Sequence, residues 1–172
     1  RFKRALKVKA ITGKGYFFFV DNVNRASPEQ YKELDLKVLA SNLCVEITLP
    51  ADDASSFTCV LSSMNLAKYN EWKDTDAVNT AIVFLDCVAQ EFIEQATAEN
   101  GEPKPGFEKT VEFTRNSRAL GLGVMGFHTL LQQESIPFES FEAHNLNNVI
   151  FKQIKDSAVG ASQWLSSQYS FD

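Results

Sequence analysis

The chain has 172 residues, and at that length folding buries roughly 68–70% of the unfolded surface, so we expect one domain, or one piece of a domain, with a hydrophobic core. Apolar residues make up 44% and charged residues 23%, an ordinary globular composition that argues against disorder and coiled coil. The net charge of -5 argues against a nucleic-acid polymer as partner, because such binders cluster Lys and Arg. The sequence has no apolar run near the roughly 20 residues of a membrane span and no signal-peptide pattern, so we expect a soluble, cytoplasmic protein with no membrane partner.

Elements before residue 60 are predicted from turn residues and from the spacing of apolar residues. Glycines end a helix, a continuous aromatic run between turn residues is typical of a strand buried on both faces, and Ser followed by Pro begins a helix. The predicted elements are a helix over 2–11 ended by glycines 13 and 15, a buried strand over 16–20, a turn over 21–24, a short helix with Ser27 as its cap and Pro28 at its first position, and an extended segment over 38–49.

After this point the sequence predicts one more strand and then mostly helices. The strongest signal is a long helix over 75–98, whose apolar residues recur at three and four positions and which Asp74 or Thr75 can cap. The other predicted elements are a buried strand over 57–61 continuing towards 66, a loop over 100–106, and helical segments over 107–117, 120–131 and 143–169. Strands alternating with helices indicate the α/β class.

The three cysteines, Cys44, Cys59 and Cys87, are an odd number and suggest no secreted disulfide framework. In a cytosolic chain they are either buried small hydrophobes or redox groups. We expect Cys87, inside the long helix, to be a core residue. Neither the cysteines nor His128 and His144 form the close ligand pairs of a structural zinc site, so we predict no metal site.

The extended segment contains an amide, a thiol and a carboxylate at every second position, in Asn42, Cys44 and Glu46. In a strand, residues two apart share a face and lie about 6.5–7 Å apart, so these three side chains are expected to project together. The opposite face is expected to anchor the segment against a core through the apolar residues Leu43, Val45 and Ile47.

This arrangement has a chemical interpretation and a structural one. A carboxylate can act as a base towards a substrate hydroxyl, and an amide can hydrogen-bond an adjacent hydroxyl. Because a negative neighbour disfavours a thiolate, Cys44 suits hydrogen-atom transfer better than nucleophilic attack. From spacing alone, the simpler interpretation is structural, since cysteine is commonly a buried small hydrophobe.

Four motifs follow one another along the chain: Ser41-Asn42-Leu43-Cys44-Val45-Glu46-Ile47, the segment 58–66 around Cys59, the glycine motif 118–127 and the segment 136–140. In this order they resemble the large (alpha) subunit of class I ribonucleoside-diphosphate reductases, and the resemblance covers nearly the whole chain. The resemblance implies part of a ten-stranded α/β barrel, with residues 38–50 as a finger loop inside it. It places barrel strands at 17–20 and 58–61.

Position by position, the resemblance implies an oxidoreductase site. Cys44 holds a transient thiyl radical that removes the 3′-hydrogen of a ribonucleoside diphosphate, and Glu46 takes the proton of the 3′-hydroxyl as general base. Asn42 hydrogen-bonds the substrate near the 2′-hydroxyl, and Ser41 adds to substrate binding. Cys59 is one of two thiols that form a redox-active disulfide.

The resemblance also implies partners that this chain does not contain. The family's allosteric domain, diphosphate-binding loop, radical-relay tyrosines and C-terminal tail lie outside residues 1–172, which we interpret as a partial catalytic barrel domain that is inactive alone. The second thiol for Cys59 lies upstream. No cofactor binds directly: the radical comes from a metal-containing small subunit, and thioredoxin or glutaredoxin is the reductant. The product is a deoxyribonucleotide for DNA replication.

Two other functions remain open. Glycines 121, 123 and 126 match the three-glycine pattern of dinucleotide-binding oxidoreductases, but the charged segment before them and the helical segment after them do not fit that fold. The stronger rival is non-enzymatic, in which a catalytically incomplete piece serves as a folding or assembly module. Complementary chains would then cover strand edges that otherwise invite aggregation.

Overall fold

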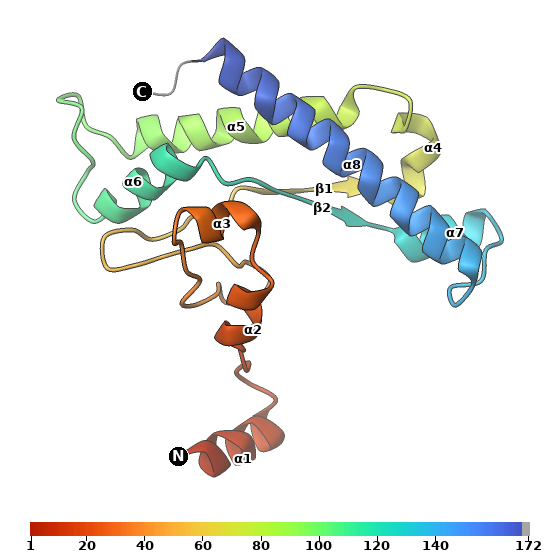
Figure 1. Ribbon diagram of the computed structural model, residues 1–172, viewed down its shortest axis with the longest axis horizontal. Coiled ribbons are helices and arrows are strands. Elements are labelled where there is room, and N and C mark those ends of the chain that lie inside the picture. The colour runs from red at the N-terminus through yellow and green to blue at the C-terminus, as the bar shows by residue number, and fades with distance from the viewer. Residues whose placement is uncertain (170–172) are drawn as a thin grey trace. The chain divides into compact units, whose positions relative to one another are not determined.

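A computed structural model describes residues 1–169 of the chain, which divides into two compact units that meet between Phe57 and Thr58. The amino-terminal unit contains three short helices, α1 (Phe2–Thr12), α2 (Val20–Arg25) and α3 (Glu29–Glu33), and a long loop (Figure 1). The prediction of α1 is confirmed, and it ends at Gly13, whose φ of 67° is the left-handed conformation that glycine tolerates.

The aromatic segment 16–20 is not a strand, and that prediction is wrong. Tyr16 and Phe19 are 68% and 69% exposed, and α2 begins at Val20, so the predicted turn at 21–24 is helical instead. A strand needs a partner for its backbone N–H and C=O groups, and no segment of the described amino-terminal unit pairs with 16–20.

The Asn24 side chain bonds both backbone groups of Val38, as a neighbouring strand would. The Asn24 amide donates to the Val38 carbonyl oxygen over 2.8 Å, and its Oδ1 accepts from the Val38 N–H over 2.9 Å. Val38 is fully buried at this point. The short helix α3 is confirmed, but Pro28 occupies its cap position and the Ser27 hydroxyl donates to the Val23 carbonyl oxygen, so the predicted cap is one residue too early.

The carboxy-terminal unit is built on two long helices, α5 (Ala77–Gln95) and α8 (Phe141–Gln168), which pack against each other (Figure 1). Both helices are predicted correctly. The buried positions of α5 are Val78, Ile82, Leu85, Ala89 and Ile93. Asp76 lies at its cap position, and the Thr75 hydroxyl accepts from the Ala77 N–H over 3.2 Å. The shorter helices are η1 (Leu66–Lys68), α4 (Tyr69–Trp72), α6 (Glu108–Ser117) and α7 (Phe127–Gln133).

Two parallel strands, β1 (Leu61–Asn65) and β2 (Gly121–Met125), pair with each other, and β1 contacts α5 (Figure 1). Their register runs from Leu61 opposite Gly121 to Asn65 opposite Met125. The strand predicted over 57–61 and continuing towards 66 is found over 61–65, so residues 57–60 precede it. The segment 120–131, predicted as helical, instead holds β2 and the start of α7, because its first half pairs with a strand 60 residues earlier in the chain.

The core lies where η1, α4, α5, α7 and α8 meet, and its central members are Leu66, Tyr69, Val78, Leu130, Ile150 and Ile154. A second cluster joins Val60 to Leu85 and Ala89 of α5. Helices packed on parallel strands place the unit in the α/β class, as predicted. Among residues 1–169 no helix is both long and apolar enough to span a bilayer.

Candidate functional site

The loop at 41–47 forms a turn rather than an extended strand. The Val45 N–H donates to the Asn42 carbonyl oxygen over 3.1 Å, and Val45 has a φ of 68°. This turn breaks the predicted two-residue alternation. Leu43, expected on the anchoring face, is 89% exposed at the turn, beside the exposed Cys44.

Side-chain hydrogen bonds join the two ends of this turn. The Asn42 amide donates to Glu46 Oε1 over 2.6 Å, and Asn42 Oδ1 accepts from the Ile47 N–H over 3.0 Å. The Ser41 hydroxyl donates to the Ile47 carbonyl oxygen over 2.6 Å. The amide and carboxylate singled out from the sequence therefore do lie together, but they are four residues apart across a turn whose tip presents the Cys44 thiol.

This geometry sets what the loop can do chemically. The Asn42 amide occupies Oε1 of Glu46, and the carboxylate remains exposed to solvent, where it can accept a proton. The half-buried Asn42 holds its carboxylate partner while its own oxygen is bonded to the backbone. The loop therefore presents a thiol and an oriented carboxylate from one short, hydrogen-bonded segment.

Cys59 belongs to the other unit and lies two residues before β1, with an exposed side chain. Its neighbour Thr58 contacts the Thr114 hydroxyl over 2.9 Å, and its neighbour Val60 is buried. Cys87 is exposed on α5, so its prediction as a core residue is wrong. The helical period explains the error, because Leu85 and Ala89 form the buried face and position 87 is turned away from both.

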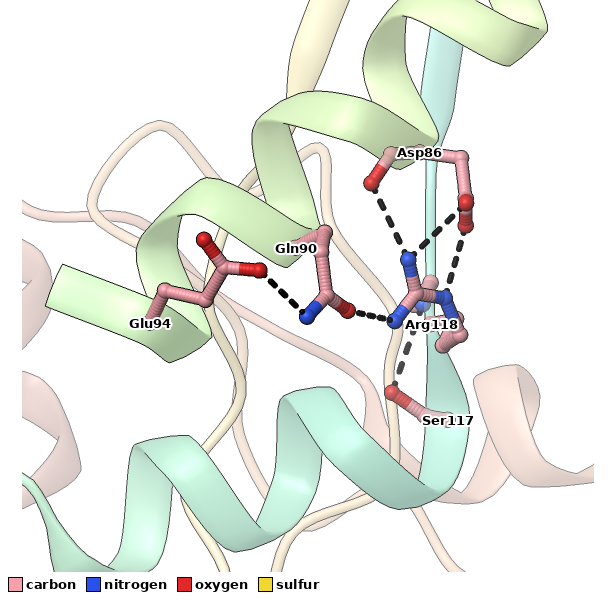
Figure 2. A network of polar contacts seen from close by, with 6 residues as sticks. Asp86, Gln90, Glu94, Ser117 and Arg118 are labelled. Carbon is pink, nitrogen blue, oxygen red and sulfur yellow. Dashed lines mark hydrogen bonds and ion pairs between the residues drawn. The ribbon is translucent and has the colours of Figure 1, made fainter. Parts of the chain in front are cut away.

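An ion pair that sequence reasoning missed lies between α5 and the start of β2. Arg118 donates from Nε to Asp86 Oδ1 over 2.7 Å and from Nη2 to Asp86 Oδ2 over 2.8 Å, and both side chains are nearly buried, at 14% and 13% exposed. Figure 2 shows the guanidinium continuing to Gln90, which in turn donates to Glu94. The sequence does contain a signal for this pair: Asp86 directly follows Leu85 on the buried side of α5, and a charge in that position needs a partner.

A cleft of about 550 Å³ borders this network, lined by Gln90, Ile93, Glu94, Thr97, Ala98, Arg115, Asn116 and Arg118.

The first two glycines of the dinucleotide-like motif, Gly121 and Gly123, lie inside β2, opposite Leu61 and Ser63. A phosphate-binding loop needs such glycines between its strand and its helix, so this geometry argues against a dinucleotide site. Within the described residues, no three His, Cys, Asp or Glu side chains are grouped as metal ligands would be.

Comparison with known proteins identifies the fold and the family. Residues 2–170 match the family model described as the ribonucleotide reductase barrel domain. The chain belongs to this family. It shares 44% identity with the class Id ribonucleotide reductase alpha subunit of Actinobacillus ureae, whose solved structure superposes with a TM-score of 0.87 over 95% of this chain. The resemblance stated from the motifs is thereby confirmed.

Relatives by sequence carry the same name. A candidate ribonucleoside-diphosphate reductase large subunit of Frog virus 3 is 38% identical over 96% of the chain, and the large subunit of Invertebrate iridescent virus 3 is 35% identical over 88%. The chain spans 29% and 23% of these two proteins, and 31% of the Actinobacillus chain. It thus corresponds to one part of a ribonucleotide reductase large subunit.

Proposed function

We propose that this chain is the catalytic-core portion of a ribonucleoside-diphosphate reductase, which reduces ribonucleoside diphosphates when the rest of the large subunit and a radical-generating small subunit are present. The observation that carries the proposal is the 41–47 turn, which contains the exposed Cys44 thiol and, two residues later, a carboxylate bonded by the Asn42 amide. It lies in a chain whose residues 2–170 match the barrel domain of this family.

The predicted site residues have separate roles in the reaction. A thiyl radical at Cys44 takes the 3′-hydrogen atom of the substrate, and Glu46 takes the 3′-hydroxyl proton, while Asn42 and Ser41 hold the substrate hydroxyls. The 2′-hydroxyl leaves as water. Cys59 and a second thiol supply two electrons and two protons by forming a disulfide, so one ribonucleotide and one dithiol give one deoxyribonucleotide, one disulfide and one water.

The remaining parts lie outside the chain. The metal-containing small subunit supplies the radical, and thioredoxin or glutaredoxin reduces the disulfide. In the complete subunit, β1 and β2 are two strands of a ten-stranded barrel around the finger loop 38–50. The site operates in the cytoplasm and supplies deoxyribonucleotides for DNA replication.

The test uses the complete large subunit with its small subunit, a ribonucleoside diphosphate and a dithiol. Cys44→Ser should abolish deoxyribonucleotide formation, because a hydroxyl does not replace the hydrogen-accepting sulfur, and Cys59→Ser should stop repeated turnover. The matched control is Cys87→Ser, which removes the third exposed thiol and should retain wild-type activity. Normal reductase activity in the Cys44→Ser enzyme would contradict the proposal.

A second, non-enzymatic role as an assembly module has one observation in its favour. Helix α1 buries none of its residues within this chain, and its apolar side chains Phe2, Leu6 and Ile11 are 67%, 43% and 73% exposed. Apolar surface of this kind favours a partner that covers it. This role is supported if the complete wild-type assembly forms but produces no deoxyribonucleotide with the radical-generating subunit present.

A further inference from the structure

The residues directly before and after Cys59 both bond one short segment of the fold. This segment, the corner at 114–121, runs from the last turn of α6 to the start of β2. On one side, the Thr58 hydroxyl contacts the Thr114 hydroxyl over 2.9 Å. On the other side, the Val60 carbonyl oxygen accepts from the Gly121 N–H over 2.9 Å. The Thr58 side chain and the Val60 backbone, one residue to either side of the thiol, are therefore bonded to the same short stretch of chain.

The donor in the contact between the Thr58 and Thr114 hydroxyls follows from the number of protons that each hydroxyl carries. The Thr114 hydroxyl donates its only proton to the Thr110 carbonyl oxygen over 2.7 Å, so Thr58 is the donor in the contact between the two hydroxyls. Thr114 is only 2% exposed and Thr58 is half-buried, so this bond is partly shielded from solvent. Removal of the Thr58 hydroxyl would leave Thr114 without that donor.

The corner is in turn fixed to α5 by Arg118, which lies between Thr114 and Gly121. Its guanidinium makes two parallel bonds to the Asp86 carboxylate, a third to the Asp86 carbonyl oxygen over 3.1 Å and a fourth to Gln90 over 3.0 Å (Figure 2). A paired guanidinium and carboxylate fix orientation as well as distance.

Arg118 adopts a backbone conformation that arginine disfavours. Its φ of 42° lies in the left-handed region at the carboxyl end of α6, where glycine is the usual residue. The helix end alone would be served as well by glycine. The side chain at this position is therefore explained by its bonds to α5 rather than by the termination of α6.

We propose that the Arg118–Asp86 pair is a positioning device that fixes the Cys59 thiol for disulfide formation with the second thiol of the large subunit. The inference rests on the proposed role of Cys59. A disulfide requires Cα atoms roughly 4.4–6.8 Å apart, so both thiols must be held at a defined separation. Loosening the corner at 114–121 lowers the effective concentration of the Cys59 thiol at its partner.

The experiment measures the disulfide equilibrium of the complete large subunit in glutathione buffers. Protein dithiol and oxidised glutathione give protein disulfide and two reduced glutathiones, and the Cys59 disulfide is quantified by acid quenching, alkylation and peptide mass mapping. Cys44 and Cys87 are replaced by Ser so that Cys59 is the only thiol of this chain that reacts.

Three variants test the device. Arg118→Gly relieves the backbone but removes the guanidinium, and Asp86→Asn removes the charge with little change of shape. Each should lower the equilibrium constant for the disulfide about tenfold, which raises the reduction potential by about 30 mV. Thr58→Val, which keeps the volume and removes one tether, should lower it about threefold.

The control is Tyr69→Phe, which removes the hydrogen bond from the Tyr69 hydroxyl to Gln153, in a different part of the same unit. Tyr69→Phe should leave the equilibrium constant for the Cys59 disulfide within twofold of the parent value. This should hold even if Tyr69→Phe lowers the melting temperature as much as the three test variants do. Constants in Arg118→Gly and Asp86→Asn equal to that of the parent would overturn the positioning role of the pair, as would an equal effect of Tyr69→Phe. If Cys59 forms no disulfide in the parent subunit, the proposed role of Cys59 fails and the positioning role fails with it.

Discussion

Single residues in this chain are explained by their contacts more than by their types. Asn42, Cys44 and Glu46 are notable in the sequence for their chemistry, yet the way they are brought together depends on a turn with a positive φ at Val45. A β-branched residue rarely adopts that conformation, so no local rule predicts the turn. The Arg118–Asp86 pair likewise joins residues 32 positions apart, and only the folded chain reveals it.

Gly126 and Gly121 give a prediction at this scale. Gly126 has a φ of 79°, and a Cβ there would lie 3.2 Å from the Ala67 backbone nitrogen. A Cβ at Gly121 would overlap the Leu61 side chain, which is 51% exposed and free to move aside. Gly126→Ala should therefore lower the free energy of unfolding by about 1–2 kcal/mol or more, because of the left-handed backbone and the crowding.

Urea unfolding of both glycine variants measures this difference, with Gly121→Ala as the comparison. We expect the smaller loss from Gly121→Ala, since only the end of a flexible side chain must shift. A larger loss at Gly121 than at Gly126 would show that pairing of β2 with β1 tolerates less displacement than the turn before α7.

At the level of elements, helices are predicted well and strands poorly. Helices α5 and α8 follow directly from apolar spacing, because their hydrogen bonds join residues four apart and their buried faces repeat locally. β1 pairs with β2, which lies 60 residues later in the chain. Because of this pairing, the first strand begins later than predicted, and a segment predicted as helical is a strand. The aromatic segment 16–20 has strand composition but no partner in the described chain.

The start of α6 gives a prediction of pH dependence. Backbone hydrogen bonds from the Glu108 N–H and from the Gly106 N–H to the Glu108 carboxylate lower the pKa of this side chain below its ordinary 4.5. Because the folded pKa is below the unfolded one, the stabilisation is present above pH 4.5 and is lost as the pH falls through the folded pKa. Glu108→Gln should therefore lower stability at pH 7 and flatten its fall on acidification.

The measurement is the urea midpoint between pH 7 and pH 3. Glu112→Gln, one helical turn later, is the matched control for the loss of one negative charge, and its carboxylate bonds the Asn116 side chain instead of the helix end. An unchanged slope with pH in Glu108→Gln would contradict the role assigned to these backbone bonds.

At the scale of the whole chain, the buried core and the exposed apolar surface describe a part of a larger protein. The unit that begins at Thr58 has its own core, formed by η1, α4, α5, α7 and α8. The chain spans less than a third of its relatives' length, and α1 carries exposed apolar residues throughout. We expect the stability of the carboxy-terminal unit to depend on that core.

Adjacent residues of α8 test this dependence. Ile150 is fully buried in the core, whereas Val149 is 58% exposed. Ile150→Ala should lower the free energy of unfolding by about 2–5 kcal/mol, because it removes buried methyl groups and leaves a cavity. Val149→Ala is the control and should change it by about 0.5 kcal/mol or less. Similar losses in both variants, measured by urea unfolding, would show that α8 is not packed through this face.

The sequence by itself indicated the family, through motifs that resemble it, and the α/β class and the long helices, through turn residues and helical periods, which are local properties. The roles assigned to the thiols and the carboxylate stay predictions. The tertiary structure decided which segments are strands, that 41–47 is a turn, that Cys87 is exposed and that Arg118 pairs with Asp86. The physical reason is that strand pairing and buried ion pairs join residues distant in sequence, so their partners exist only once the chain has folded.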